Sequence, residues 1–202
     1  MQLHRVNSFY DRQIDRALRG ARVLCLSDYP RLVLFSDVHR GNGSWSDSFL
    51  NNKPLYEAAL HYYDARDFAC VELGDGDELW ENRNITDISE IRSDVFSKLA
   101  DFAAKERLFL LWGNHDRVKS SVKFRAAAGT SYSFLPRAVE SLILEDPTGG
   151  RRVHLLHGHQ VDPWNNQLWK LTRWLVRYLW KPLELAGFKD PTSAAKNYKR
   201  RE

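Results

Sequence analysis

The chain has 202 residues, enough for one domain with a sizeable hydrophobic core. Hydrophobic residues make up 43% and charged residues 28%, as in soluble globular proteins, and no apolar run approaches the roughly 20 residues that would span a bilayer. The charged first twenty residues are unlike a secretory signal peptide, and the two cysteines, Cys25 and Cys70, both lie in apolar runs. We therefore expect a cytoplasmic protein with buried, reduced thiols.

Charge is distributed unevenly along the chain. The formal net charge is +4, yet residues 151–202 contain 11 lysines and arginines against 4 acidic residues. This basic C-terminal quarter predicts contact with an anionic partner in the same region.

The spacing of apolar residues predicts a series of helices and strands. A first helix is capped by Asn7 or Ser8 and ends at Arg19. The further segments are strands over 21–26 and 31–35, a loop over 42–52, a helix over 53–64, a strand over 68–73, a helix over 87–105, and strands over 107–112, 138–144 and 153–156. Strands that alternate with helices predict an α/β layered fold, and short apolar runs fit strands buried on both faces.

Four polar motifs each follow one of these apolar runs, where open α/β sheets place their ligands. The first contains Asp37 and His39. Residues i and i+2 of an extended segment face the same side, so one carboxylate and one imidazole can reach one ion. Taken alone, this motif is equally consistent with solvated polar residues near a turn.

The second motif is Gly74-Asp75. Glycine permits a sharp turn and a close approach by an ion, and a carboxylate has two oxygens with which to bridge two ions. The acidic residues that follow, Asp77 and Glu78, are expected either to support the ligands or to be solvated, and at least one of them to be solvated.

The third motif, Gly113-Asn114-His115-Asp116, is the most specific. Asn114 offers a neutral carbonyl oxygen to a metal, and His115 titrates near neutral pH, so it can act as an acid or stabilise an oxyanion. Asp116 can orient the imidazole and raise its pKa. The alternative is an asparagine-containing turn that caps a helix.

The fourth motif places His157 and His159 two residues apart, so that both can face the same side. The preceding motifs favour His157 as a metal ligand. His159 is left open between a ligand and a structural residue, and His154 is expected to be structural.

Two adjacent cations would lower the pKa of a bridging water and clamp phosphate oxygens, while His115 helps the leaving oxygen depart. The motifs resemble those of the calcineurin-like metallophosphoesterase family, whose pattern is D-x-H, G-D, G-N-H-D/E, a histidine, and G-H-x-H. The separations fit the family: 38 residues from Asp37 to Asp75, 39 from Asp75 to Asn114, and 43 from Asn114 to His157. The matching positions are Asp37, His39, Asp75, Asn114, His115, Asp116 and His157.

The resemblance implies a role for each matched residue. Asp37 and His39 hold one ion, Asp75 bridges, and Asn114 and His157 hold the other. His115 is then the catalytic histidine and Asp116 its partner. The implied fold is a β-sandwich of mixed sheets flanked by helices in four layers, α-β-β-α. The implied cofactors are two divalent ions, with Mn²⁺ favoured and iron or zinc as alternatives.

The final family motif is missing. The segment 158–161 begins like G-H-x-H but lacks the second histidine, and it stands in the place of the preceding element. We therefore expect a C-terminally truncated sequence, with the last strands missing and an incomplete site that leaves this chain inactive.

Residues 164–185 form a second unusual feature, a tryptophan-rich segment with basic residues on one predicted helical face and leucines on another. Pro182 is expected to end or kink this helix. Such a helix can lie on an anionic lipid or membrane surface, or it can be an ordinary helix packed on the domain. Residues 1–160 are thus predicted to form the catalytic domain, and 161–202 a basic helical insertion or cap of the same domain. UDP-diacylglucosamine hydrolases, a branch of the same family, look similar in having a helical insertion here.

The leading prediction is a metal-dependent phosphoesterase that hydrolyses phosphomonoesters, including phosphoproteins, with a hydroxide activated by a dinuclear metal centre. One alternative is a pyrophosphatase of the UDP-diacylglucosamine type, working as a peripheral protein at the membrane surface. Another is a non-catalytic interaction module. Nucleic acid is not an expected partner.

Overall fold

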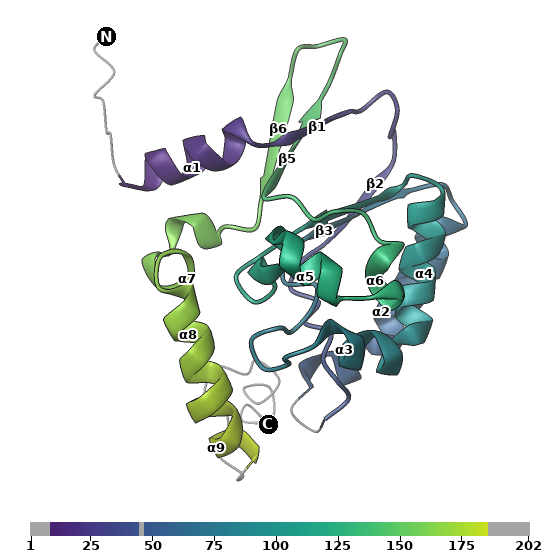
Figure 1. The fold of residues 1–202 in the computed structure, drawn as a ribbon. Coiled ribbons are helices and arrows are strands. Elements are labelled where there is room, and N and C mark those ends of the chain that lie inside the picture. The colour runs from purple at the N-terminus through teal and green to yellow at the C-terminus, as the bar shows by residue number, and fades with distance from the viewer. Residues whose placement is uncertain (1–8, 45–46, 186–202) are drawn as a thin grey trace, which may run out of the picture.

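A computed structural model describes residues 9–44 and 47–185 of the chain. The described part is an α/β structure with two three-stranded sheets (Figure 1). This confirms the predicted α/β class. Within the described residues, no helix has both the length and the apolar character needed to cross a membrane.

The first sheet supplies most of the core. Its order is β2-β3-β4 and its strands are all parallel, with Cys70 of β3 in register with Val33 on one side and Leu108 on the other. Its strands are β2 (Leu32–Phe35), β3 (Ala69–Leu73) and β4 (Leu108–Leu111). Every residue of β4 is buried, as expected for a short apolar strand covered on both faces.

The second sheet has the order β1-β5-β6. β1 (Arg22–Cys25) pairs in parallel with β5 (Ser141–Glu145), and β5 pairs antiparallel with β6 (Arg152–Leu156). Residues just before β5 also bond to the first sheet, since the Trp112 amide donates to the Val139 carbonyl at 3.0 Å. The segment that becomes β5 therefore leaves the edge of one sheet and enters the other.

The core has two parts because side chains alternate along the strands. Val71 and Phe109 face the second sheet and pack with Leu24, Leu142 and Leu144. Their sequence neighbours face the other way and pack against the helices. The first sheet thus lies between the second sheet and a helical layer (Figure 1).

The helices of this outer layer are α2 (Lys53–Asp64), α3 (Ile85–Ile91) and α4 (Ser93–Ala104). The prediction of one helix over 87–105 is wrong at Arg92, where the backbone leaves helical geometry with φ −107° and ψ 29°. The buried Arg92 guanidinium donates to Asp47 at 2.5 Å and to the Gly41 carbonyl at 3.3 Å. Tethering of this side chain to the preceding loop accounts for the break.

The remaining elements complete the fold. α1 (Phe9–Arg19) lies against the start of β5, where the Ser141 hydroxyl donates to the Ala17 carbonyl at 2.7 Å. The short helices after β4 are α5 (Val122–Ala127) and α6 (Thr130–Ser133), and those after β6 are α7 (Pro163–Asn166), α8 (Trp169–Leu175) and α9 (Lys181–Leu185).

The tryptophan-rich helix does not end at Pro182. Between α8 and α9 the backbone widens into a π-helical segment over Val176–Trp180, in which the Lys181 amide donates to the Val176 carbonyl. A widened turn is one way for a helix to accommodate a proline, which has no N–H of its own. The helix therefore continues to Leu185.

Candidate metal centre

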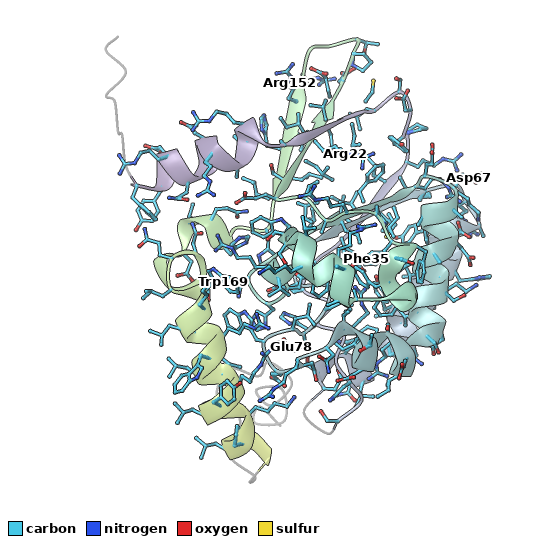
Figure 2. The ribbon with its side chains drawn as sticks, in the orientation of Figure 1. Arg22, Phe35, Asp67, Glu78, Arg152 and Trp169 are labelled. Atoms are coloured by element: carbon cyan, nitrogen blue, oxygen red, sulfur yellow. The ribbon has the colours of Figure 1, made fainter. Side chains whose placement is uncertain are left out.

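The four predicted motifs meet at one edge of the first sheet. The carboxyl ends of the parallel strands β2, β3 and β4 share this edge, which brings together the loops that hold Asp37, Asp75 and Asn114. His157 arrives by another route. It follows β6, which runs antiparallel to β5, and the start of β5 is bonded to the end of β4. Figure 2 shows Glu78 near this edge, with Arg152 at the far end of the second sheet.

The ligand-bearing loops have unusual backbone conformations. Asp37, His39 and Asp75 have φ values of 54°, 51° and 51°, in the left-handed region. Non-glycine residues seldom adopt this region, and such residues cluster at functional sites. The prediction that Asp37–His39 is an extended segment is therefore wrong. The loops are held together by backbone bonds from Asp37 to Gly74 at 3.2 Å and from His39 to Asp75 at 2.9 Å.

Four side chains converge on one point. Nε2 of His157 lies 3.4 Å from Asp75 Oδ2 and 3.5 Å from Asp37 Oδ1. Nε2 of His39 lies 3.9 Å and 3.8 Å from the same two oxygens. Two ligands that each sit about 2.1 Å from one ion are separated by about 3.0–3.4 Å. Asp37, Asp75 and His157 can therefore hold a metal ion, and His39 lies slightly farther out, 3.8–3.9 Å from the two carboxylates.

The electrostatics of this group also fit a cation. Burial and the neighbouring Asp116 raise the pKa of Asp75, whose side chain is only 3% exposed. Burial alone would lower the pKa of His39, but hydrogen bonds with Asp37 and Glu78 raise it to about 10. A bound cation would take the place of the proton on His39 and compensate the buried carboxylate. Asp37 is 58% exposed, so the group opens to solvent on that side.

Two glycines leave room for the ligands. A Cβ on Gly74 would lie 2.6 Å from the His157 ring, and the residue has φ +107°. A Cβ on Gly113 would lie 2.1 Å from Oδ1 of Asp75. Any larger residue at either position would push a ligand out of place, which explains the two glycines in the motifs.

Glu78 supports two histidines at once. Its carboxylate accepts from Nδ1 of His39 at 2.8 Å and from Nδ1 of His115 at 2.8 Å. Contacts of this length are hydrogen bonds, and the same three side chains are also close enough together to form a second group that could hold a metal ion. With Nδ1 of His39 bonded to a carboxylate, Nε2 is the free ligand atom, as in many carboxylate–histidine–metal sites. The sequence left the role of Glu78 open between support and solvation, and its position three residues after Asp75 was the only signal.

His115 has the properties of a general acid. Burial lowers its pKa, but the charge and hydrogen bond of Glu78 outweigh this and raise it above the ordinary value. The Trp80 ring stacks on the imidazole, with centroids 4.0 Å apart and planes at 19°. Glu78 and Trp80 thus fix the orientation of the ring. Sequence reasoning did not identify Trp80, and a lone aromatic residue in a polar loop is a weak signal.

The resemblance implies that Asp116 is the partner of His115, but in the structure Asp116 bonds to other groups. Its carboxylate is fully buried and accepts backbone N–H bonds from Gly113 at 2.7 Å and Gly76 at 3.1 Å. It also accepts from the Lys119 ammonium. Asp116 therefore ties the loop after β4 to the loop after β3. Nδ1 of His115 instead bonds to Glu78.

Asp77 belongs to the same buried layer and is not solvated. It pairs with Lys119 at 2.7 Å and with Arg40 at 2.7 Å, and Arg40 also pairs with the buried Glu72. These residues form a continuous ionic network beneath the candidate metal ligands. Removing one partner from such a network leaves an uncompensated buried charge.

The other predicted residues are placed as follows. Asn114 is buried at the end of β4, between the two glycine-flanked loops, and its amide remains a predicted ligand. His159 is buried against Trp112, with ring centroids 5.1 Å apart and no hydrogen-bond partner on either nitrogen. Burial and the neighbouring His157 lower the pKa of His159 to about 3, so its ring is neutral. His154 is exposed on β6, away from the four donors.

The chain was compared with models of protein families, with curated protein sequences and with solved structures. None of the three comparisons gives a match.

Proposed function

We propose that this protein is a metal-dependent hydrolase of phosphate esters. The observation that carries the proposal is the convergence of Asp37, His39, Asp75 and His157 beside the supported imidazole of His115. Carboxylate oxygens and imidazole nitrogens suit Mn²⁺, Fe²⁺ and Zn²⁺, and the presence of two carboxylates makes Mn²⁺ the proposed ion. We further propose a second ion, held by Asp75 with the amide of Asn114.

Bound divalent cations supply a nucleophile at neutral pH and neutralise charge on phosphoryl oxygens. The chain supplies the rest. Nδ1 of His115 is engaged by Glu78, so Nε2 is the nitrogen available to a substrate. Because its pKa is raised, the imidazole carries a proton that it can give to the leaving oxygen. Trp80 holds the plane of the ring and shields it on one side. Phosphomonoesters, including phosphoproteins, are the proposed substrates.

The test is hydrolysis of an aryl phosphate with Mn²⁺, together with Mn²⁺ binding by calorimetry. Asp75→Ala should lose both metal binding and activity, because a ligand is removed. His115→Ala should lose activity by about two to four powers of ten and keep metal binding, since a general acid contributes on that order. Lys98→Ala, on an exposed face of α4, is the control and should behave like the wild type.

Activity that survives in both variants would refute the proposal. Metal binding without hydrolysis of any phosphate ester by the wild type would instead favour the interaction module.

A second candidate, a pyrophosphatase acting on a lipid-linked substrate at a membrane surface, is favoured by the orientation of α8 and the helix that follows it. The basic face packs inward: Arg177 donates to the Leu79, Trp80 and Asn82 carbonyls, and Lys181 donates to the Glu81 carbonyl. The leucine face is left in solvent, with exposed fractions of 40–50%. Its members are Leu168, Leu171, Leu175 and Leu179. Exposed apolar helix faces of this kind bind membrane surfaces or protein partners.

Co-sedimentation with vesicles of phosphatidylcholine and phosphatidylglycerol tests this second candidate. The double variant Leu171→Ser/Leu179→Ser should lose binding, because it removes apolar surface without touching the inward contacts. The matched control is Leu55→Ser/Tyr62→Ser, which alters two exposed apolar residues of α2. Equal sedimentation of both variants and the wild type would reject the membrane surface.

A further inference from the structure

A hollow of about 280 Å³ lies along α8 and the π-helical segment and is open to solvent on the side of Trp174 and Tyr178. Its lining is basic and aromatic and includes no acidic residue among the described part of the chain. The lining residues are Trp169, Lys170, Arg173, Trp174, Arg177 and Tyr178. The volume is close to the lower limit of small-molecule sites, which is about 300 Å³.

Arg173 is the unexplained residue in this hollow. Its Nε atom is buried and has no hydrogen-bond partner, and among the described residues no acidic side chain forms an ion pair with it. Burial, and then the charge of Arg177, lower its pKa to about 10, so it is still a cation at neutral pH. The residue as a whole is partly exposed, and a buried N–H donor without a partner is costly in a folded protein. Its retention therefore calls for a ligand of opposite charge.

The neighbouring cations increase the need for an anion. Nε and Nη2 of Arg177 donate hydrogen bonds to three backbone carbonyls, which carry no net charge. Arg83 lies at the margin, where it donates to the Tyr178 hydroxyl at 3.2 Å. Lys170 lies over the Trp169 ring at 6.0 Å. Several positive charges thus surround a space that the described side chains do not neutralise.

We propose that this hollow is a binding site for the phosphoryl group of an organic phosphate, with Arg173 as its principal contact. A guanidinium is planar and presents paired N–H donors that match phosphate oxygens. The rings of Trp169, Trp174 and Tyr178 supply flat apolar walls for the organic part of the same ligand, by stacking or apolar contact. The ligand class is therefore a phosphate ester that carries an aromatic or apolar group.

The hollow is separate from the candidate metal centre but close to it. Arg177 bonds to the carbonyl of Trp80, whose ring stacks on His115. The phosphoryl site does not depend on metal chemistry and exists whether or not the protein is a hydrolase. If the protein is the hydrolase proposed above, on which this last step rests, the site selects which phosphate esters are bound beside the centre.

The test uses phenylphosphonate, which has a phosphoryl group and a ring but no ester bond to hydrolyse. Binding to the full-length protein is measured by calorimetry and by quenching of tryptophan fluorescence, after EDTA treatment removes any metal. Methylphosphonate lacks the ring and benzyl alcohol lacks the phosphoryl group. Phenylphosphonate should bind more tightly than either.

Arg173→Met keeps the apolar stem and removes the guanidinium. It should weaken phenylphosphonate binding about tenfold or more, the loss expected for one charge-assisted pair. Arg173→Lys should recover part of the affinity. Arg151→Gln, at a position whose side chain is 85% exposed, is the control and should bind like the wild type.

Thermal unfolding separates a ligand-binding role from a structural one. Without ligand, Arg173→Met should be as stable as the wild type or more so, because it removes a guanidinium whose buried Nε has no partner. With phenylphosphonate, only the wild type should gain stability. A ligand-free loss of stability in Arg173→Met, equal affinity in both proteins, or no binding by the wild type would each overturn the proposal. Because metal is absent throughout, failure here is distinct from failure of the proposed hydrolase activity.

Discussion

Asp116 has either a structural role or a catalytic one, and the variant Asp116→Asn tests which of the two is correct. The substitution keeps the shape of the side chain and removes its charge. Four backbone N–H groups donate to this carboxylate. Those of Gly113, Gly76 and Asp75 lie at 2.7, 3.1 and 3.3 Å, and that of Asp77 lies at 3.4 Å and contributes least. A hydrogen bond to a charged acceptor contributes about 1.5–3 kcal/mol to stability, and one to a neutral acceptor about 0.5–1.5 kcal/mol. Each of these bonds should therefore lose about 1 kcal/mol when the charge is removed.

The total loss should therefore be about 3 kcal/mol of unfolding free energy, in line with the cost of about 3–5 for breaking a buried pair. The lower end of that range applies because Lys119 keeps Asp77 at 2.7 Å. In urea denaturation the midpoint should fall by about 1 M or more, given a slope of about 1–3 kcal/mol per molar. Asp101→Asn, at an exposed position of α4, is the control and should change the free energy by less than about 0.5 kcal/mol.

Hydrolysis measured on the same samples completes the test. If Asp116→Asn left the urea midpoint unchanged and still removed the activity, Asp116 would act on His115 directly and the structural argument would be wrong.

Three further perturbations examine other parts of the site. Glu78→Gln removes the charge that raises the pKa of His115, so in the metal-free protein this pKa should fall, as followed by NMR titration of the ring protons. In Gly113→Ala the new Cβ would lie 2.1 Å from Asp75 Oδ1, so Mn²⁺ affinity should fall about tenfold or more by calorimetry. Acid should destabilise the fold through Asp77, because two buried cations outweigh the effect of burial and lower its pKa from 3.8 to about 2. A carboxyl group whose pKa is lower in the folded state stabilises the fold when the pH is above its unfolded-state pKa. This stabilisation is lost as the pH falls to the folded-state pKa. In urea titrations at decreasing pH, about 2 kcal/mol should therefore disappear between pH 3.8 and 2 in the wild type, and this step should be absent in Asp77→Asn.

Each of these has its own control or contrary result. An unchanged imidazole pKa in Glu78→Gln would show that the carboxylate does not support His115. Gly20→Ala, where the nearest atom to the new Cβ is 3.9 Å away, should leave Mn²⁺ affinity as it is. Identical acid profiles for the wild type and Asp77→Asn would show that another carboxylate controls unfolding at low pH.

Local patterns in the sequence determined much of the secondary structure. Helix α2 spans Lys53–Asp64, as the helical spacing predicted, with a proline at its start where no N–H is needed. The short apolar runs became strands, but burial on both faces holds only for β3 and β4, whereas β1, β2 and β6 keep exposed residues. Candidate residues at the strand ends could be found because parallel strands bring their carboxyl ends to one edge, whatever the details of packing.

Tertiary contacts decided the features that local patterns do not encode. The break at Arg92 depends on a salt bridge to Asp47 in a distant loop. The positions of Glu78 and Asp116 depend on how loops with left-handed residues fold over one another, and neither position carries a periodic signal.

The tryptophan-rich helix illustrates the limit most directly. Its amphipathic sequence specified two faces but not which one would face the domain. Arg177 and Lys181 donate hydrogen bonds to the backbone carbonyls of residues 79–82. These contacts hold the basic face against the domain and leave the leucines on the outside. A sequence pattern can define a helix and its two faces, and only the surface that it meets selects the face that is buried.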